Sequence, residues 1–329
     1  MIQHWLNRWS ALWHPERYHG WGRKKGYFEG WYYKVVSNDE RLACAFIPGI
    51  SIDASGDSHS FIQVIDGTSG KTFYHRYEPD SFRPKADSFA VTVGNSYFDM
   101  ETLKVDVPGI QGQLRLSNPF PWPKTMGAPG VMGWYSFVPF MQCYHGIVSM
   151  NHSLSGHLTY EGTHYDFDEG LGYIEKDWGT SFPRCWIWMQ SNHFEELDRR
   201  VSFMASIAHI PWLGHYFVGF LVGILVDDEL FQFTTYNKSE IRASLDDSHV
   251  YLNFSRGALS LDVKATKGHT GELASPIVGE MTGKVNESLS SSIQVKLTRG
   301  DKLIYQGAGK HAGLEVAGDV SILLDDNGQ

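Results

Sequence analysis

The chain has 329 residues, of which 42% are hydrophobic and 20% are charged, and this composition excludes a disordered chain. The formal net charge is −9 with neutral histidines, which argues against general nucleic-acid binding because phosphate backbones are also anionic. The three cysteines, Cys44, Cys143 and Cys185, are too widely spaced for a disulfide framework and fit a reducing cytoplasm.

The first predicted element is an amphipathic helix within residues 1–20, ended by Pro15. Its apolar positions recur at helical spacing on one face: Ile2, Trp5, Leu6, Trp9, Leu12 and Trp13. Such a face packs against the body of a protein or plugs a barrel, but a Trp-rich face is also typical of a peripheral membrane anchor. The sequence shows neither a secretory signal nor an apolar run long enough for a spanning helix. We therefore expect a cytoplasmic protein, with membrane association through this helix left open.

From about residue 26 the sequence predicts short β-strands separated by turns. The segments 28–36, 42–50 and 60–65 are rich in β-prone residues, and each ends at turn-forming residues. Further segments of the same kind follow at spacings near ten residues. This rhythm is typical of an antiparallel sandwich or an up-and-down barrel, so the expected fold class is all-β with a short N-terminal helix.

Residues 117–143 interrupt the strand rhythm with five prolines and several glycines. Such a stretch is the best candidate for a boundary between two β units. The predicted organisation is a helix in residues 1–20, a first β half in 21–140 and a second β half in 141–329.

The second half contains carboxylates close to several large aromatic side chains. Glu175 and Asp177 are separated by one residue, and they are followed by Trp178, Trp186 and Trp188. An apolar aromatic wall disfavours the charged form of a carboxyl group and raises its pKa, so that the group can donate a proton near neutral pH. Glu175 is the candidate acid and Asp177 a candidate catalytic neighbour. The structural alternative is a carboxylate that only accepts backbone hydrogen bonds.

Strand alternation predicts which side chains share a face. Tyr173 lies on the face of Glu175, whereas Trp186, Trp188 and Gln190 share a face of the following strand. Together they predict an apolar pocket with a few polar groups, as ligand sites have. The alternative is that the tryptophans belong only to the core.

A similar cluster lies upstream, in Gly-Tyr-Phe-Glu-Gly-Trp-Tyr-Tyr-Lys at residues 26–34. Glu29, Trp31 and Tyr33 share one strand face, and we predict that they contact substrate. Glu29 is alternatively a buried structural acceptor.

Four histidines, His145, His152, His157 and His164, cluster in the sequence, but their spacing mixes the two faces of a strand. A metal-ligand pattern is missing, so we expect no metal. His145 is a candidate second proton-transfer group, with a solvated or core histidine as the alternative.

Three motifs resemble the tocopherol cyclase family: Phe-Glu-Gly-Trp-Tyr-Tyr-Lys at 28–34, Glu-Lys-Asp-Trp-Gly with Ser-Phe-Pro-Arg-Cys-Trp at 175–186, and Gly-Glu-Met-Thr-Gly-Lys-Val-Asn-Glu at 279–287. Their order and spacing match as well, and the resemblance spans roughly residues 20–320. It implies a lipocalin-like (calycin) fold of two antiparallel barrel or sandwich halves. It also implies a cofactor-free reaction that protonates a prenyl double bond and closes a chromanol ring.

Residues 173–179 are more distantly similar to the acidic motif of the carotenoid hydratases, which protonate an isoprenoid alkene and add water. The acid of that motif matches Glu175 and its aromatic residue matches Tyr173, while His145 is a looser match to an upstream histidine. The relatives have Asn where this chain has Asp177, so the role of this residue does not carry over.

The resemblance implies that Glu175 donates the proton, that Tyr173 or His145 accepts the phenol proton, and that the tryptophans of the motifs face the cation. The expected partner is a hydrophobic small molecule, and neither a cofactor nor nucleic acid is expected. Two alternatives remain: a non-catalytic carrier of a hydrophobic ligand, and a hydratase or pericyclic enzyme on the same fold.

Overall fold

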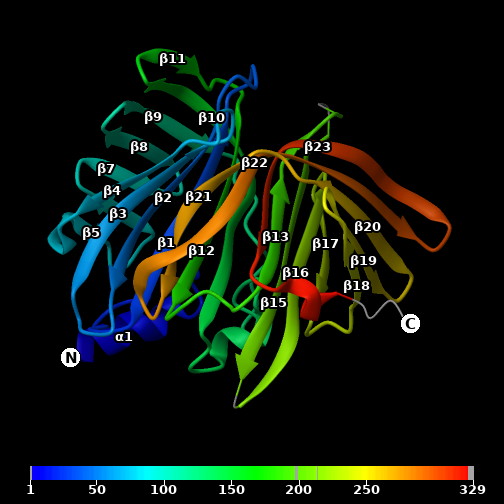
Figure 1. The fold of residues 1–329 in the computed structure, drawn as a ribbon, viewed down its shortest axis with the longest axis horizontal. Coiled ribbons are helices and arrows are strands. Elements are labelled where there is room, and N and C mark those ends of the chain that lie inside the picture. Colours follow the sequence, from blue (N-terminus) through cyan, green and yellow to red (C-terminus); the bar gives the residue numbers. More distant parts are fainter. Residues whose placement is uncertain (1, 197–198, 213, 325–329) are drawn as a thin grey trace. The chain divides into compact units, whose positions relative to one another are not determined.

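The structure is a computed structural model that describes residues 2–324 apart from 197, 198 and 213. Over this part of the chain, one short α-helix precedes two antiparallel β-sheets (Figure 1), which confirms the predicted all-β fold class. The chain forms two compact units, the first of residues 1–182 with 273–284, and the second of 183–272 with 285–329.

Helix α1 spans Ile2–Ala11. Leu6 and Trp9 of its apolar face remain exposed, whereas Ala11 at its end is buried. The side chains of Ile2 and Trp5, which the sequence assigns to the same face, lie outside the described residues. Among the helices that the structure describes, none is long and apolar enough to span a membrane.

The sheet of the first unit has the strand order β4-β3-β2-β1-β12-β10-β9-β8-β7-β6-β5, with β11 paired to β10. The bounds are β1 Tyr27–Val36, β2 Ala43–Ile52, β3 Ser58–Asp66, β4 Thr72–Tyr77, β5 Phe82–Pro84, β6 Ala90–Val93, β7 Ser96–Asp99, β8 Thr102–Val107, β9 Ile110–Ser117, β10 Cys143–Tyr160, β11 Thr163–Asp166 and β12 Leu171–Gly179. The 3₁₀ turn η1, Pro79–Ser81, joins the two edge strands, and η2, Gly133–Phe137, lies between β9 and β10.

The first sheet is rolled around a core of its own. Tyr33 of β1 packs on Phe98 of β7 with ring centroids 5.5 Å apart, although several strands separate β1 and β7 in the sheet. Trp31 stacks on Phe89 in the same core at 5.9 Å. Rolling buries one face of β8 and of β9, which explains the alternating burial along these two strands.

The boundary between the units lies at residue 182, not at the predicted residue 140. Strands β10 and β12, which the sequence analysis placed in the second half, complete the sheet of the first unit. Strand β12 pairs with β1 and with β10, so its backbone hydrogen bonds fix it in the first sheet. The proline-rich stretch of 117–143 is therefore a loop within one unit, because proline content marks interrupted strands without specifying which strands pair.

The second sheet has the order β17-β16-β15-β13-β23-β22-β20-β19-β18, with β14 paired to β23 and β21 to β22. The bounds are β13 Trp186–Ser191, β14 His193–Phe194, β15 Val201–Trp212, β16 His215–Val226, β17 Glu229–Thr234, β18 Glu240–Leu245, β19 His249–Arg256, β20 Leu259–Thr266, β21 Thr270–Ile277, β22 Glu280–Arg299 and β23 Lys302–Ala317.

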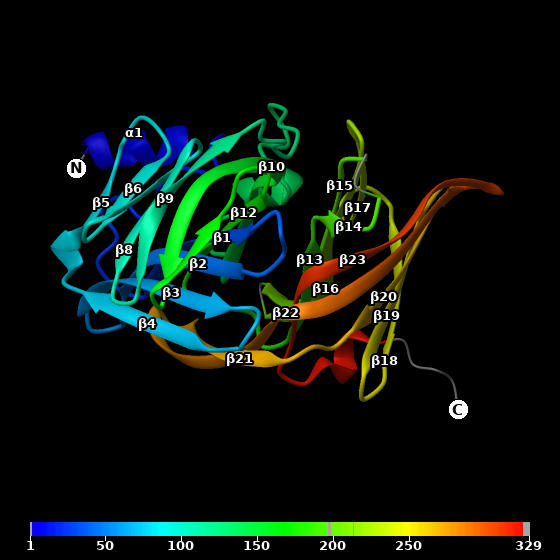
Figure 2. The same ribbon diagram turned by 90° about the horizontal axis from the view of Figure 1, so that it is seen from above.

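The second unit is also rolled around its own core. Phe220 of β16 and Phe233 of β17 pack against Phe254 of β19, with centroid distances of 5.9 and 6.2 Å. The short turn η3, Val320–Leu323, adds two buried apolar side chains to this core. Figure 2 shows the strong curvature of strands β18 to β20 and β22 in this unit.

The third sequence motif forms a close backbone contact in the first unit. Gly279 has φ 83°, and a Cβ atom there would lie 2.1 Å from the carbonyl oxygen of Ile52. The hydroxyl of Ser51 donates a 2.6 Å hydrogen bond to the carbonyl of Gly279. Only glycine both adopts this positive φ without strain and leaves room for the carbonyl oxygen of Ile52. Residues 276–286 are mostly strand, as parts of β21 and β22.

Candidate active site

Strand β12 presents different groups on its two faces, and its neighbours complete both sets. Asp177 lies opposite His145 of β10, and Glu175 lies opposite Tyr32 of β1. Because side chains alternate along a strand, Tyr173, Glu175 and Asp177 share one face, whereas Lys176 belongs to the other. Two separate polar groups result, and they are described in turn.

The first group, here called the acid cluster, consists of Tyr173, His145, Glu175 and Asp177. The Tyr173 hydroxyl donates a 2.5 Å hydrogen bond to Oε2 of Glu175. His145 bridges the two carboxylates, with Nδ1 2.8 Å from Oδ1 of Asp177 and Nε2 3.7 Å from Oε2 of Glu175. Tyr173 and Glu175 are buried, whereas the Asp177 side chain is 27% exposed. The structure thus brings together all four residues that were predicted to be catalytic.

The acid cluster is arranged for proton transfer between neighbours. When the neutral His145 ring carries its proton on Nδ1, this N–H donates a hydrogen bond to Asp177. The unprotonated Nε2 then faces Glu175. Burial, together with the charge of Glu175, raises the pKa of Tyr173 well above its ordinary value. Tyr173 therefore stays protonated near neutral pH and acts as a donor to Glu175, which leaves His145 as the group of this pair that is suited to accept a proton.

The same cluster offers a set of metal ligands. His145, Glu175 and Asp177 each provide one ligand atom, and these atoms all lie within 4.8 Å of one another. A histidine with two carboxylates suits several divalent ions. His145 and Asp177 also form a 2.8 Å contact with each other, so these side chains are suited to an ion as well as to a direct hydrogen bond.

Aromatic rings accompany the acid cluster on this face of the first sheet. Phe61 of β3 covers Gly49 so closely that a Cβ at Gly49 would lie 2.5 Å from its ring. Gly30, which is opposite Asp177 in β1, is also within 4.0 Å of this ring by the same measure. Tyr74 stacks on Phe61 with centroids 5.3 Å apart. Sequence reasoning missed Phe61 because only strand pairing brings β3 to this part of the sheet.

The second group is a buried ion pair on the opposite face of β12. The ammonium of Lys176 contacts Oε1 of Glu29, and both side chains are fully buried. Glu29 also accepts hydrogen bonds from the backbone amides of His19 and Gly20 and a 2.5 Å bond from the Tyr27 hydroxyl. Burial opposes charge on Glu29, but Lys176 and His19 outweigh it and lower its pKa below the ordinary value.

Two predicted substrate-binding tryptophans enclose this ion pair. The Lys176 ammonium lies 4.7 Å from the ring centroid of Trp31 and 4.6 Å from that of Trp178. Both rings thus already contact a cation of the protein itself, the Lys176 ammonium. Lys176 further donates to the carbonyl of Arg17, and His19 stacks on Trp178 at 4.2 Å. The group therefore fastens the segment after α1 to strands β1 and β12.

The upstream motif consequently lies away from the acid cluster. Trp31 and Tyr33 are completely buried in the core of the first unit, and Glu29 and Trp178 share their side of the sheet. The Tyr33 hydroxyl donates to the carbonyl of Asp99, as a core tyrosine does. These four residues were expected to line the substrate pocket with Glu175. We infer instead a structural role for them, because β1 pairs with β12 in a register that puts them on the opposite face.

The remaining predicted pocket residues belong to the second unit. Trp186, Trp188 and Gln190 share one face of β13, whereas Ile187 and Met189 point into the core of that unit. The indole of Trp186 donates a 2.5 Å hydrogen bond to Glu315 of β23. Strand alternation is as predicted, and contact of these three residues with substrate stays a prediction.

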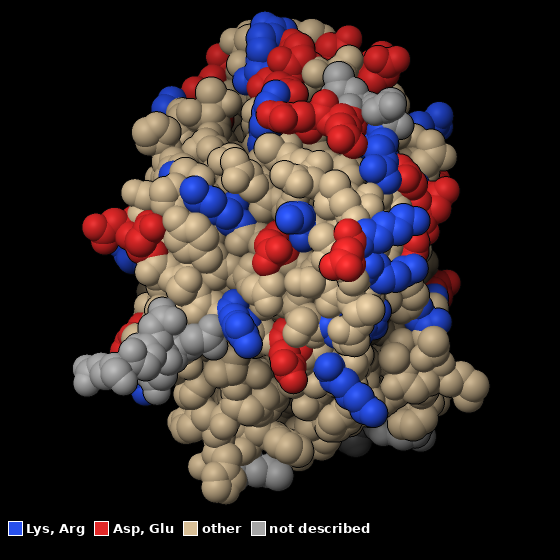
Figure 3. Space-filling view, turned by 90° about the vertical axis from the view of Figure 1, so that its right-hand side faces the viewer, with Lys and Arg blue, Asp and Glu red and all other residues tan. Residues whose placement is uncertain are grey.

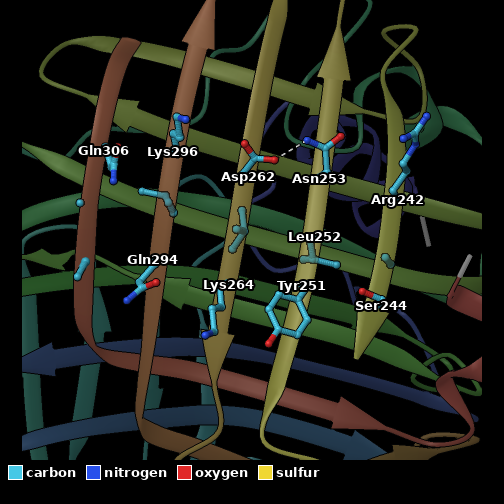
Figure 4. A pocket seen from close by; sticks show the side chains of 15 residues that line it. Arg242, Ser244, Tyr251, Leu252, Asn253, Asp262, Lys264, Gln294, Lys296 and Gln306 are labelled. Atoms are coloured by element: carbon cyan, nitrogen blue, oxygen red, sulfur yellow. Dashed lines mark hydrogen bonds between the residues drawn. The ribbon is translucent and has the colours of Figure 1, made fainter. Parts of the chain in front are cut away.

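A hollow of about 840 Å³ lies on the second unit, and none of the residues predicted to be catalytic is among those that line it. Figure 4 shows its labelled side chains projecting from adjacent strands of β18 to β23, among them Arg242, Lys264 and Lys296. Asn253 donates a 2.7 Å hydrogen bond to Asp262 there. Figure 3 shows basic and acidic side chains interspersed on the face it presents. The lining thus mixes apolar residues with several charged and amide side chains, unlike the mostly apolar pocket that the sequence predicts.

We expect Asp177→Asn to weaken catalysis through His145 and not through substrate binding. An amide holds the ring less firmly and no longer favours the protonated imidazole, so kcat should fall by about 10- to 100-fold while KM changes little. The measurement is the pH dependence of kcat in both proteins. Asp166→Asn on β11, outside the cluster, serves as the control. An unchanged pH profile with normal kcat would exclude a positioning role for Asp177.

Comparisons with known proteins agree with the fold and motifs. A model of the "tocopherol cyclase-like" family matches residues 113–318, more than half of the chain. A chloroplastic tocopherol cyclase of Zea mays is 30% identical over 103 residues, which are 31% of this chain and 22% of that protein. The match thus spans about a fifth of the length of the maize protein.

Two solved structures share the fold over most of their length. The crystal structure of CghA with Sch210972 has a TM-score of 0.57 at 11% identity and covers 89% of both chains. A putative AttH protein of Nitrosomonas europaea has a TM-score of 0.51 at 12% identity, covering 88% of this chain and 92% of that one. At these identities the likeness shows the fold alone.

Proposed function

Because the chain belongs to the tocopherol cyclase-like family, we propose that it catalyses an acid-initiated cyclisation of a prenylated quinol or related isoprenoid. The observation that supports this most is the acid cluster. A buried carboxyl group, Glu175, is held by Tyr173 at 2.5 Å and faces an imidazole that Asp177 orients. A non-catalytic carrier needs an apolar cavity but has no use for such a proton relay.

The proposed reaction begins with Glu175 in its protonated form. Its carboxyl proton passes to a trisubstituted double bond of the prenyl chain, and a tertiary carbocation forms while Glu175 becomes a carboxylate. The phenol oxygen of the substrate then attacks the cation and closes the ring. His145 Nε2 accepts the phenol proton and returns it to Glu175 across 3.7 Å. Product and substrate have the same atoms, so the cycle consumes no cofactor.

The aromatic surroundings supply the second requirement of this chemistry. A carbocation survives only where water is excluded and where aromatic faces or carboxylates stabilise it. In the first unit, the rings on the face of Glu175 include those of Tyr32, Phe61 and Tyr74. Trp186 and Trp188 remain proposed contributors from the second unit.

The test is incubation of the purified protein with a prenylated hydroquinone, followed by mass spectrometry of the products. We expect a product of unchanged mass and altered retention time, equally formed with and without a chelator. A gain of 18 mass units, the mass of water, would instead establish hydration. A metal-dependent product would refute the cofactor-free mechanism, and a ligand recovered unchanged would identify a carrier.

A further inference from the structure

Large apolar side chains are exposed at one end of the first unit, on α1 and on the loop between β9 and β10. Phe140 is 98% exposed and Met126 is 89% exposed. The set, here called the apolar patch, is Leu6, Trp9, Met126, Trp134, Phe137 and Phe140. Isolated exposed apolar residues are ordinary, but a group rich in aromatic side chains marks an interaction surface.

The two parts of the apolar patch are in direct contact. Trp13, just after α1, packs on Trp9 and on Phe137 with centroid distances of 5.6 Å in both cases. Its indole nitrogen donates a 3.2 Å hydrogen bond to the carbonyl of Met126. Figure 1 shows α1 and this loop at the same end of the first unit. The patch is therefore one surface built from two segments distant in sequence.

Phe140 is held in an unfavourable backbone conformation. Its φ is 64°, in the left-handed region where glycine and asparagine are favoured and bulky residues are rare. Its side chain is also almost fully exposed, so the isolated unit gains no burial from this residue. An exposed phenylalanine ring of this kind is a candidate contact for a partner surface.

The two segments that carry the patch contain more basic than acidic residues, and one of these cations, Lys124, pairs with Glu16 at 2.7 Å. Residues 2–28 and 117–142 contain six Lys and Arg but a single acidic residue, Glu16, in a chain of net charge −9. Burial and the neighbouring charge of Arg23 lower the pKa of Arg8, which places these two cations close together. Trp21, two residues before Arg23, stacks on His4 of α1 with ring centroids 6.2 Å apart. Apolar and aromatic side chains beside basic ones suit an anionic lipid surface.

The loop of the patch also contacts the acid cluster. The Tyr144 hydroxyl donates to the carbonyl of Val138 at 2.7 Å, and the backbone amide of His145 lies 3.1 Å from the sulfur of Met132. One segment of chain thus joins the exposed aromatic residues to His145.

We propose that the apolar patch binds the surface of a bilayer containing anionic phospholipid. Trp9, Trp134 and Phe140 enter the interface, and the surrounding Lys and Arg contact headgroups. This membrane contact goes beyond the proposed reaction and holds whether or not the protein is an enzyme. If the reaction is also as proposed, the patch places His145 next to the membrane from which a prenyl lipid is taken.

The test is flotation of the full chain with vesicles of phosphatidylcholine mixed with phosphatidylglycerol. We expect binding that weakens at high salt and with vesicles of phosphatidylcholine alone. The variant Trp134→Ser with Phe140→Asn should reduce the partition coefficient about tenfold or more. Asn suits the positive φ of residue 140, so the variant should keep its fold, as circular dichroism would verify.

The matched control is Leu303→Ser with Ile322→Ser, which removes two exposed apolar side chains from the second unit. This control should float like the unmodified protein. Equal flotation of the patch variant, or no flotation of the unmodified chain, would overturn the proposal. The proposal would also be overturned if the unmodified protein did not bind vesicles but formed dimers in light scattering, and if the patch variant did not form them. The patch would then be an interface between two copies of the chain.

Discussion

Replacement of Glu175 by Gln is expected to lower turnover of a prenylated hydroquinone by about 100- to 10,000-fold, the range that general acid catalysis contributes. The amide has nearly the shape of the protonated carboxyl group and still accepts the Tyr173 hydrogen bond, but it cannot release a proton to an alkene. Binding of the substrate should therefore be nearly unchanged. Single-turnover kinetics measure the chemical step, and equilibrium dialysis measures the affinity.

A matched control is Glu161→Gln, since Glu161 is a surface carboxylate in a turn between β10 and β11. It should leave both turnover and binding unaltered. Retained turnover in Glu175→Gln would remove Glu175 from the role of acid and direct attention to His145. A variant that loses turnover together with substrate affinity and thermal stability would contradict a purely catalytic role.

Replacement of Glu29 by Gln is expected to destabilise the protein by about 3–5 kcal/mol at neutral pH, because the Lys176 ammonium would be left buried without its counter-ion. Lys176→Met should cost a similar amount, since it leaves the Glu29 carboxylate unpaired. The double variant should be more stable than the sum of the two losses predicts, because it removes both charges. Urea unfolding followed by fluorescence gives the three free energies.

The exposed pair of Lys71 and Glu161 provides the control, with side chains 56% and 48% exposed. Lys71→Met should change the free energy of unfolding by about 0–1 kcal/mol, because solvent screens such pairs. If Glu29→Gln lowered the free energy of unfolding by no more than Lys71→Met does, the buried pair would not hold the segment after α1 in place.

The loss in the free energy of unfolding that Glu29→Gln causes should also depend on pH. Burial lowers the pKa of Lys176 to about 8 in the folded protein, below its ordinary value of 10.5, although Glu29 opposes this shift. Between these two values the unfolded chain holds more protons than the folded protein, so stability rises with pH. Without Glu29 the folded pKa is lower still and the rise begins at lower pH. The difference between the variant and the parent should therefore shrink as the pH is raised from 7 to 9.

The predicted fold class follows from local pattern. Short β-prone segments with turn residues between them indicated two antiparallel β halves, and the structure has two rolled sheets. The boundary at residue 140 was wrong because β12 returns to pair with β1, a contact between residues 27–36 and 171–179. Proline and glycine positions show where strands stop, but they carry no information on which distant strand a segment pairs with.

The sequence by itself determined which side chains share a face of a given strand. Because successive residues of a strand point to opposite sides, the common face of Tyr173, Glu175 and Asp177 was predictable from their numbers. The Glu-Trp motif of β1 and the acidic motif of β12 were equally recognisable in the sequence, although their chemistry differs in the structure.

Only the tertiary structure decided which faces meet. The register of β12 with β10 puts His145 beside Asp177, and the register with β1 puts Glu29 on the side of Lys176. Register depends on backbone hydrogen bonds between distant segments and on the burial of one face in a rolled core, and a shift by one residue would exchange the two faces. For that reason Glu29, in the first of two similar motifs, belongs to a structural ion pair, whereas Glu175, in the second, belongs to the candidate active site.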